Sequence, residues 1–229
     1  MRNLLSIIVL CGLFIPGVSA QKIKLGILAG PDMTTNNSSS RTVTNASNPS
    51  RDHNNTINKS FSFFGGMVAS VPVSRNIIFR PQLQYIAKGW VTHHDFMDPS
   101  VSDYDTKLAS HWIELPLNFV YNVPSKNGRF FFGLGPYASY ALSATIHDDR
   151  ESGDRKIEFK KGDATDTIPT ANRFDIGANF IAAYEFRNGF FLSLNYSHGF
   201  VDFRNDTDDN VQPENKNIVI GLGIGYMFK

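Results

Sequence analysis

After residue 20 the chain contains no cysteine. Its single cysteine, Cys11, lies in an apolar N-terminal stretch, so the rest of the chain has neither disulfides nor thiol chemistry. Secreted soluble domains often carry disulfides, and their absence points away from that class. The chain also lacks an excess of either charge, with 22 basic and 21 acidic residues. No basic surface for nucleic acid is indicated, and we expect no nucleic-acid partner.

A transmembrane helix is also missing from the sequence pattern after residue 20. The most apolar stretch runs from Phe130 to Ile146, but it contains Gly133, Gly135 and Pro136, and its apolar residues alternate with smaller ones. Alternation with a period of two is typical of a β-strand. We therefore interpret this stretch as a strand.

The N-terminus has the three parts of an export signal. Arg2 supplies a positive charge, residues 4–15 are apolar, and Val18-Ser19-Ala20 is a small-residue cleavage site. The apolar part is too short for a membrane anchor, and Pro16-Gly17 follows it. The sequence predicts a signal peptide at residues 1–20, cleaved after Ala20, and one domain at residues 21–229.

The clearest structural signal is a hairpin between Asn172 and Phe203. On each side of Asn188-Gly189, apolar residues such as Phe180 and Leu194 alternate with small or polar residues. Both turn residues tolerate positive φ, so the pair predicts a two-residue type I′ turn.

The same alternation recurs along the chain. It predicts eight strands, joined by connections that alternate between long and short, with long loops at residues 33–59, 91–109, 147–171 and 204–216. The expected strands are 22–30, 60–73, 77–90, 111–121, 129–146, the two strands of the 172–203 hairpin, and 217–229. Membrane barrels have an even number of strands, short periplasmic turns and long extracellular loops. We predict an all-β fold, an eight-stranded antiparallel up-and-down transmembrane β-barrel.

The two faces of these strands differ in size. One carries Phe, Ile and Leu. The other is rich in Gly, Ala, Ser and Asn. A soluble eight-stranded carrier would turn its polar face to water, but such small residues suit a narrow barrel interior better than a water-facing surface. A few charged residues share this small face, and buried charges must be paired. We expect an ion-pair network that closes the lumen, and its members are Arg80, Glu114, Arg173, Asp175 and Glu185. Lys24 and Lys88 are expected as further cations of this network.

Several segments resemble one known family. HWIELPLNFVYNV, FFFGLGPYASYALSATI, FDIGANFIAAYEF and the ending IGLGIGYMFK are similar, in this order, to the PorT-like outer-membrane β-barrel domain of Gram-negative bacteria. The resemblance implies a small eight-stranded barrel without a general catalytic motif. The last strand also resembles the assembly signal read by the barrel insertion machinery, with Gly223, Tyr226 and Phe228 in the matching positions. In this chain Lys229 follows the final aromatic residue.

Three other groups of residues contain side chains typical of catalytic or metal sites. Ser197-His198 pairs a nucleophile with a base, but adjacent residues of a strand point to opposite faces. His93-His94-Asp95, with His111 or His147, lies in or beside predicted loops without the spacing of a closed metal site. Residues 206–210 resemble part of a calcium loop but lack its central Gly and distal Glu. We expect no catalytic, cofactor or metal site.

The sequence therefore predicts a non-enzymatic protein of the cell outer membrane. Its expected partners are outer-membrane lipid, the insertion machinery and an extracellular ligand bound through four polar loops. The alternative is a narrow channel or an accessory protein in transport or secretion. The sequence indicates neither the ligand nor the oligomeric state.

Overall fold

The structure, a computed structural model, describes residues 23–36, 41–43, 53–150, 153–157, 159, 171–203 and 216–228. The predicted signal peptide and the acidic segment 206–210 lie outside these ranges. The described residues form ten strands, which are β1 (Lys24–Asn36), β2 (Arg41–Val43), β3 (His53–Pro72), β4 (Ile77–Phe96), β5 (Tyr104–Ser125), β6 (Gly128–Asp148), β7 (Asp154–Lys156), β8 (Phe174–Phe186), β9 (Phe190–Gly199) and β10 (Asn217–Met227).

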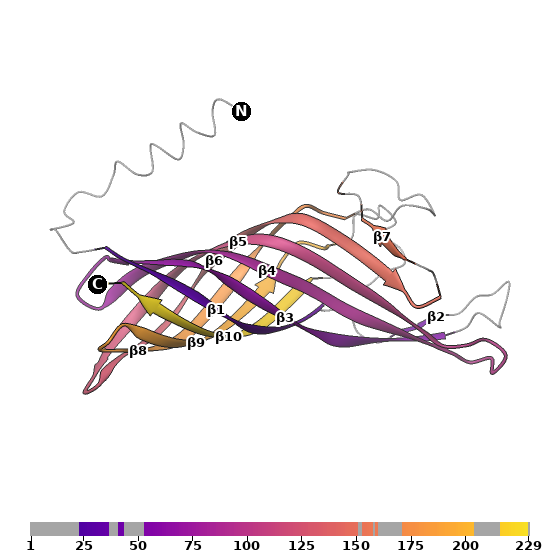
Figure 1. Ribbon diagram of the computed structural model, residues 1–229, viewed down its shortest axis with the longest axis horizontal. Helices are drawn as coiled ribbons and strands as arrows, with labels where there is room; N and C mark the ends of the chain where they lie inside the picture. Colours follow the sequence, from indigo (N-terminus) through magenta and orange to yellow (C-terminus); the bar gives the residue numbers. More distant parts are fainter. Residues whose placement is uncertain are drawn as a thin grey trace, which may run out of the picture.

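Eight of the strands form a closed antiparallel ring. Its order is β1-β10-β9-β8-β6-β5-β4-β3, and β3 pairs back onto β1. At the closure Ile27 of β1 lies opposite Tyr226 on one side and Met67 on the other. Figure 1 shows the resulting long barrel, whose strands are strongly tilted relative to its axis. The predicted eight-stranded barrel is confirmed, and β2 and β7 are short additions that pair with β3 and β6.

Alternation along each strand separates the two faces as the sequence predicts. The outer face carries most of the large apolar side chains, and Gly135, Gly177 and Gly221 face the interior together with a few large rings such as Phe131 and Phe191. Six aromatic residues are exposed on the outer face, and all but Tyr85, which lies in the middle of β4, are near strand ends, as expected for interfacial girdles. They are Tyr85, Tyr121, Phe130, Phe186, Phe190 and Phe228. No helix within the described ranges is long and apolar enough to cross a membrane.

Three short connections lie at one end of the barrel, which we call the turn end. They join β3 to β4, β5 to β6 and β8 to β9. The predicted type I′ turn at Asn188-Gly189 is wrong in detail, since of the two residues only Gly189 has positive φ, 97°. The Gly189 amide donates to the Phe186 carbonyl at 3.0 Å. These features fit a three-residue loop that ends in a left-handed glycine.

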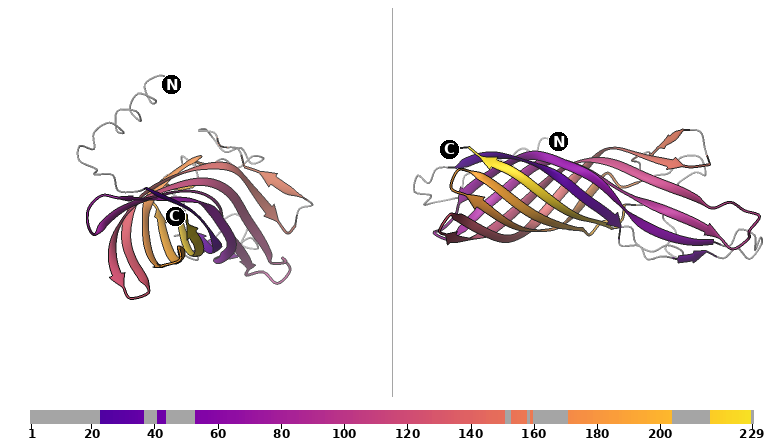
Figure 2. Two further views of the ribbon diagram at one scale, coloured as in Figure 1. Left: turned by 60° about the vertical axis from the view of Figure 1, so that its left-hand side comes forward. Right: turned by 60° about the horizontal axis from the view of Figure 1, so that its bottom comes forward.

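At the opposite end, the loop end, four neighbouring strands continue beyond the ring. β3, β4, β5 and β6 have 20–22 residues, whereas β8, β9 and β10 have 10–13. Figure 2 shows them leaving the barrel as a curved sheet on one side of its mouth. The predicted loop 91–109 is therefore wrong, because 91–96 and 104–109 are paired strand residues. We call the part formed by residues 53–59, 90–96, 104–110 and 144–148 the loop-end sheet.

Candidate functional site

The lumen contains two separate clusters of buried charges. The first, near the turn end, is centred on Arg80, whose Nη1 lies 3.5 Å from Glu185 Oε2. Arg129 Nη2 donates to the other Glu185 oxygen at 2.6 Å. The Arg80 guanidinium lies between the rings of Phe131 and Phe191, 4.8 and 4.7 Å from their centroids. Because Arg80 is completely buried, its charge depends on these partners.

The second cluster lies toward the loop end and is centred on Lys88. Lys88 Nζ lies 2.6 Å from Glu114 Oε2 and 3.7 Å from Asp175 Oδ2. Tyr137 donates to Asp175 at 3.0 Å, and Asn217 donates to the same carboxylate at 3.1 Å. Five different strands, β4, β5, β6, β8 and β10, thus supply polar groups to one carboxylate–lysine cluster.

The structure therefore brings four of the five expected network residues into the lumen, as two clusters rather than one network. Glu185 belongs to the first cluster, and Glu114 and Asp175 belong to the second. Lys88 is central to the second, whereas Lys24 lies exposed at the turn end.

Arg173 is a correction to the expected network. It lies outside the lumen, is exposed, and donates to Tyr140 Oη at 2.9 Å. The sequence places Arg173 on the same face as Asp175, but β8 begins only at Phe174, so strict alternation does not extend to residue 173.

A set of polar side chains, which the sequence pattern did not reveal, forms hydrogen bonds around a β-bulge in β3. The pairing of β3 with β4 shifts between Lys59 and Phe64. At this bulge the Ser62 hydroxyl lies within hydrogen-bond distance of two acceptors, Asp32 and the Ala87 carbonyl, and Thr34 exchanges hydrogen bonds with the Gly89 backbone. Bulges increase local bending, and this one lies where β3 leaves the ring for the loop-end sheet. The only sequence signal was the poor alternation around Phe64.

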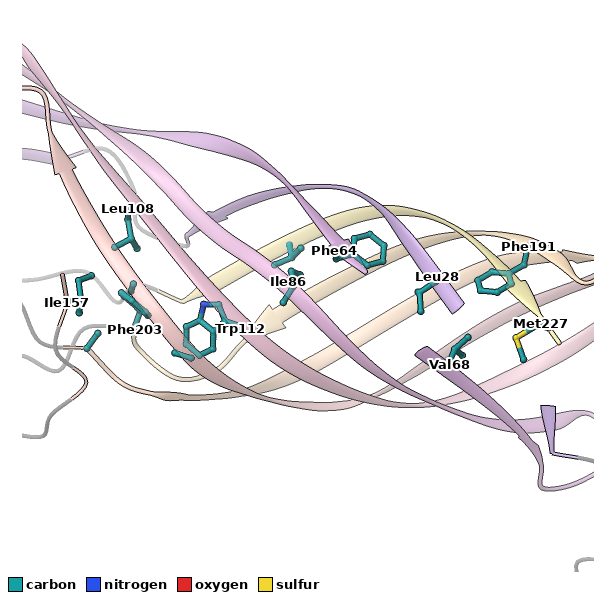
Figure 3. Close-up of a cluster of buried hydrophobic side chains, with 14 residues drawn as sticks. Leu28, Phe64, Val68, Ile86, Leu108, Trp112, Ile157, Phe191, Phe203 and Met227 are labelled. Carbon is teal, nitrogen blue, oxygen red and sulfur yellow. The ribbon is translucent and has the colours of Figure 1, made fainter. Parts of the chain in front are cut away.

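Apolar side chains fill the space beside the charges. Figure 3 shows them as a column from Met227 and Phe191 to Trp112 and Phe203. Phe203 packs edge-on against Trp90, with ring centroids 5.7 Å apart, and so covers the loop-end mouth. A cavity between Phe64, Gln84 and Asn195 has a volume of about 10 Å³. That is room for about one water molecule.

The inner face of the loop-end sheet carries a cluster of rings. His94 stacks on Tyr104 with centroids 4.4 Å apart, and His53 packs against both His94 and Phe96. The Arg150 guanidinium lies 3.4 Å from the Tyr104 centroid and makes a bidentate contact with Asp148. Those hydrogen bonds lower the pKa of Asp148 to about 2. We call His53, His94, Phe96 and Tyr104 the ring cluster.

The outer face of the same sheet is polar and carries exposed ion pairs. His93 Nδ1 lies 2.7 Å from Asp105, Lys107 lies 3.2 Å from Asp149, and His147 lies close to Asp149 and Asp154. The hydrogen bond to Asp105 raises the pKa of His93. Burial lowers the pKa of His94, its neighbour on the inner face, and nearby His53 and Arg150 act in the same direction.

The sequence candidates for chemistry are separated in space. Ser197 is buried and accepts a hydrogen bond from Asn179, whereas His198 lies on the outer face beside Tyr196. Within the described ranges, no group of three His, Cys, Asp or Glu residues could hold a metal ion. The predicted assembly residues lie on β10 and just beyond it. Gly223 faces the lumen, Tyr226 packs edge-on against Phe190, and Phe228 is exposed.

Comparison with known proteins gives one family. The model of the family described as outer membrane protein beta-barrel domain matches residues 19–205. No curated protein matches the chain.

Three similar solved structures are distant in sequence. Ail, the attachment invasion locus protein of Yersinia pestis, is 12% identical, covers 91% of this chain and 100% of its own, and has a TM-score of 0.36. Neisserial surface protein A has the same identity and coverages and a TM-score of 0.44. OprG of Pseudomonas aeruginosa is 12% identical, covers 90% of this chain and 95% of its own, and has a TM-score of 0.43.

Proposed function

Since the chain belongs to the outer membrane protein β-barrel domain family, we propose that its barrel is a non-enzymatic anchor that presents a binding surface outside the cell. The turn end then faces the periplasm and the loop end faces outward. One observation carries the proposal. The four strands β3–β6 have 20–22 residues, about twice the ~9–11 needed to span a membrane. The extra length forms a sheet that the membrane does not require.

The inner face of this sheet favours carbohydrate as the ligand class. The ring cluster offers π-faces from three strands, and the side-chain atoms Asn55 Oδ1 and His94 Nδ1 beside it are buried without a hydrogen-bond partner among the described residues. Buried polar groups usually find partners, so these two atoms leave hydrogen-bonding capacity unused beside the rings, which supports a ligand that brings hydroxyl groups.

A glycan array tests the proposal with the folded full-length protein. We expect binding to a subset of glycans, and loss of at least about tenfold in signal for the variant H94A/Y104A, because it removes the central stacked pair. The variant H93A/D105N is the matched control, since it changes the outer face of the same two strands. Binding that survives in H94A/Y104A, or that fails equally in both variants, would contradict a site on the inner face.

The alternative function, a narrow channel, predicts a different measurement. The buried charges and the aromatic column fill the lumen, which supports a barrel without steady conductance. We expect no single-channel current from the purified protein in a planar bilayer. A steady current would favour the channel or a transport accessory role.

The finer assignments of the chain are also proposals. The PorT-like resemblance and export through a signal peptide at residues 1–20 are consistent with membership of this family. We propose no secretion role, because no residue supports one. Amino-terminal sequencing of the protein purified from outer membranes tests the cleavage site, which we expect after Ala20.

Assembly through the insertion machinery is tested at the end of β10. Phe228→Ala removes the final aromatic residue, and we expect it to lower the amount of folded barrel in the outer membrane. Phe132→Ala is the control, because Phe132 is another exposed outer-face aromatic, away from the last strand. Equal losses in the two variants would show a general effect of losing an aromatic and not a terminal signal.

A further inference from the structure

The turn end of the barrel is unusually basic. Each of the three short turns carries one cation and no acid, Arg75, Lys126 and Arg187, and all three side chains are exposed. Lys24 is exposed at the same end. None of these four has an ion pair within the described part of the chain. The loop-end sheet differs, because Lys107 there lies 3.2 Å from Asp149, and His93 and His147 also lie beside aspartates.

The nearest carboxylate does not neutralise this surface. Glu185 is buried, and both of its oxygens face guanidinium groups, those of Arg129 and Arg80. It lines a vestibule of about 220 Å³ at the turn-end mouth, together with Lys24, Arg129 and Arg187. Three cations and one already paired acid leave this vestibule with a net positive charge. The volume is smaller than the ~300 Å³ and above typical of drug-sized ligands, and it suits a single anionic group.

The position of these cations relative to lipid identifies the occupant. Exposed aromatic residues of the girdle lie within a few positions of two of the turns, Tyr121 before Lys126 and Phe186 beside Arg187, and exposed Val73 and Ile77 flank Arg75. A strand rises about 3.3 Å per residue, so the cations lie at the depth of the lipid head groups. Long Lys and Arg side chains reach such groups while their methylenes stay on apolar surface.

We propose that the turn end binds the phosphate head groups of anionic phospholipids in the periplasmic leaflet, through Arg75, Lys126, Arg187 and Lys24. Four unpaired cations at head-group depth match a negative lipid surface in charge and in geometry. The vestibule gives one such phosphate a place where Lys24 and Arg187 converge. This inference is independent of the loop-end ligand, since the two surfaces lie at opposite ends of the barrel.

Native mass spectrometry of the folded full-length protein tests the proposal. The probes are phosphatidylglycerol, phosphatidylcholine with the same acyl chains, and inorganic phosphate. We expect the wild type to retain phosphatidylglycerol in preference to phosphatidylcholine. The variant R75Q/K126Q/R187Q should lose roughly tenfold or more of that preference, since each Lys or Arg near an anionic surface contributes about a fivefold effect.

A matched variant removes the same charge from the other end. K59Q/K107Q/K156Q replaces three exposed lysines of the loop end, and we expect it to keep the wild-type preference. The shift of the folded band on unheated gels checks that both variants are folded. Equal retention of the two lipids by the wild type would overturn the proposal and favour an acidic periplasmic protein as partner. Retention of phosphatidylglycerol by the turn-end variant would also overturn it, as would its displacement by inorganic phosphate alone.

Discussion

The two halves of the barrel wall face different media along their length. β1, β8, β9 and β10 have 10–13 residues, and their outer faces are apolar over most of that length. β3–β6 repeat this pattern and then continue into the loop-end sheet, where the outer face carries His93, Lys107 and His147 instead. The backbone pairing is the same in both parts. The type of side chain on each face therefore follows the medium that the face meets. It does not follow from the strand conformation, which is the same in both parts.

The same contrast applies to ion pairs. Lys88 and Glu114 are almost completely buried in the lumen, whereas Lys107 and Asp149 in the loop-end sheet are 48% and 41% exposed. A buried charge without its partner is strongly destabilising, whereas exposed pairs contribute little. Lys88 of β4 and Lys107 of the neighbouring strand β5 thus offer a direct comparison.

The largest effect is expected from Lys88→Met. This change leaves Glu114 and Asp175 without their shared cation, which should lower the free energy of unfolding by about 3–5 kcal/mol. Lys107→Met, the control, should lower it by no more than about 1 kcal/mol. Urea unfolding of the barrel in lipid vesicles, followed by tryptophan fluorescence, measures both. Similar losses would show that burial does not distinguish the two ends.

An intermediate effect is expected where backbone and rings approach each other inside the barrel. At Gly225 a Cβ would overlap the Phe191 ring and the Ile27 carbonyl, whereas at Gly65 the nearest atom would be 3.6 Å away. Gly225→Ala should lower the free energy of unfolding by about 1–3 kcal/mol, as overpacking does. Gly65→Ala should leave it nearly unchanged in the same urea experiment. A tolerated Gly225→Ala would mean that Phe191 can move and that the lumen is less tightly packed.

The strands inside the membrane were predictable because each has one face toward lipid and one toward a narrow interior. Phe180 and Asn179, for instance, lie on opposite faces as their alternation predicts. Residues 91–96 and 104–109 were predicted as loop because both faces of the loop-end sheet meet water or polar groups, so no alternation marks them. His94 and Tyr104 meet only through pairing between strands, which the sequence pattern alone does not reveal.

The candidate sites also divide into features that the alternation of residues predicts and features that depend on contacts between strands. Arg80, Glu114, Asp175 and Glu185 could be selected because a charge on the small face has few alternatives to burial. Their division into two clusters depends on the tilt of the strands, which decides which residues meet across the lumen. Asp32 contacts the β3 bulge through Ser62, and Arg75, Lys126 and Arg187 lie in turns, where alternation gives no information about contacts.

The smallest expected effect is a difference in pKa between two histidines on opposite faces of one strand, β4. His93 and His94 are adjacent, yet the pKa of His93 is raised by its bond to Asp105 and that of His94 is lowered by burial. We expect NMR titration to show His93 losing its proton above, and His94 below, the ordinary value of about 6.5. Protonated His93 therefore stabilises the folded sheet below that value, and the contribution is lost as the pH rises through its folded pKa. The protonation of His94 affects stability in the opposite direction, because its lowered pKa makes the fold less stable as the pH falls below about 6.5.

The variant Asp105→Asn should return the pKa of His93 toward the ordinary value and leave that of His94 unchanged. A shift of both histidines would show that the two faces of the sheet are electrostatically coupled.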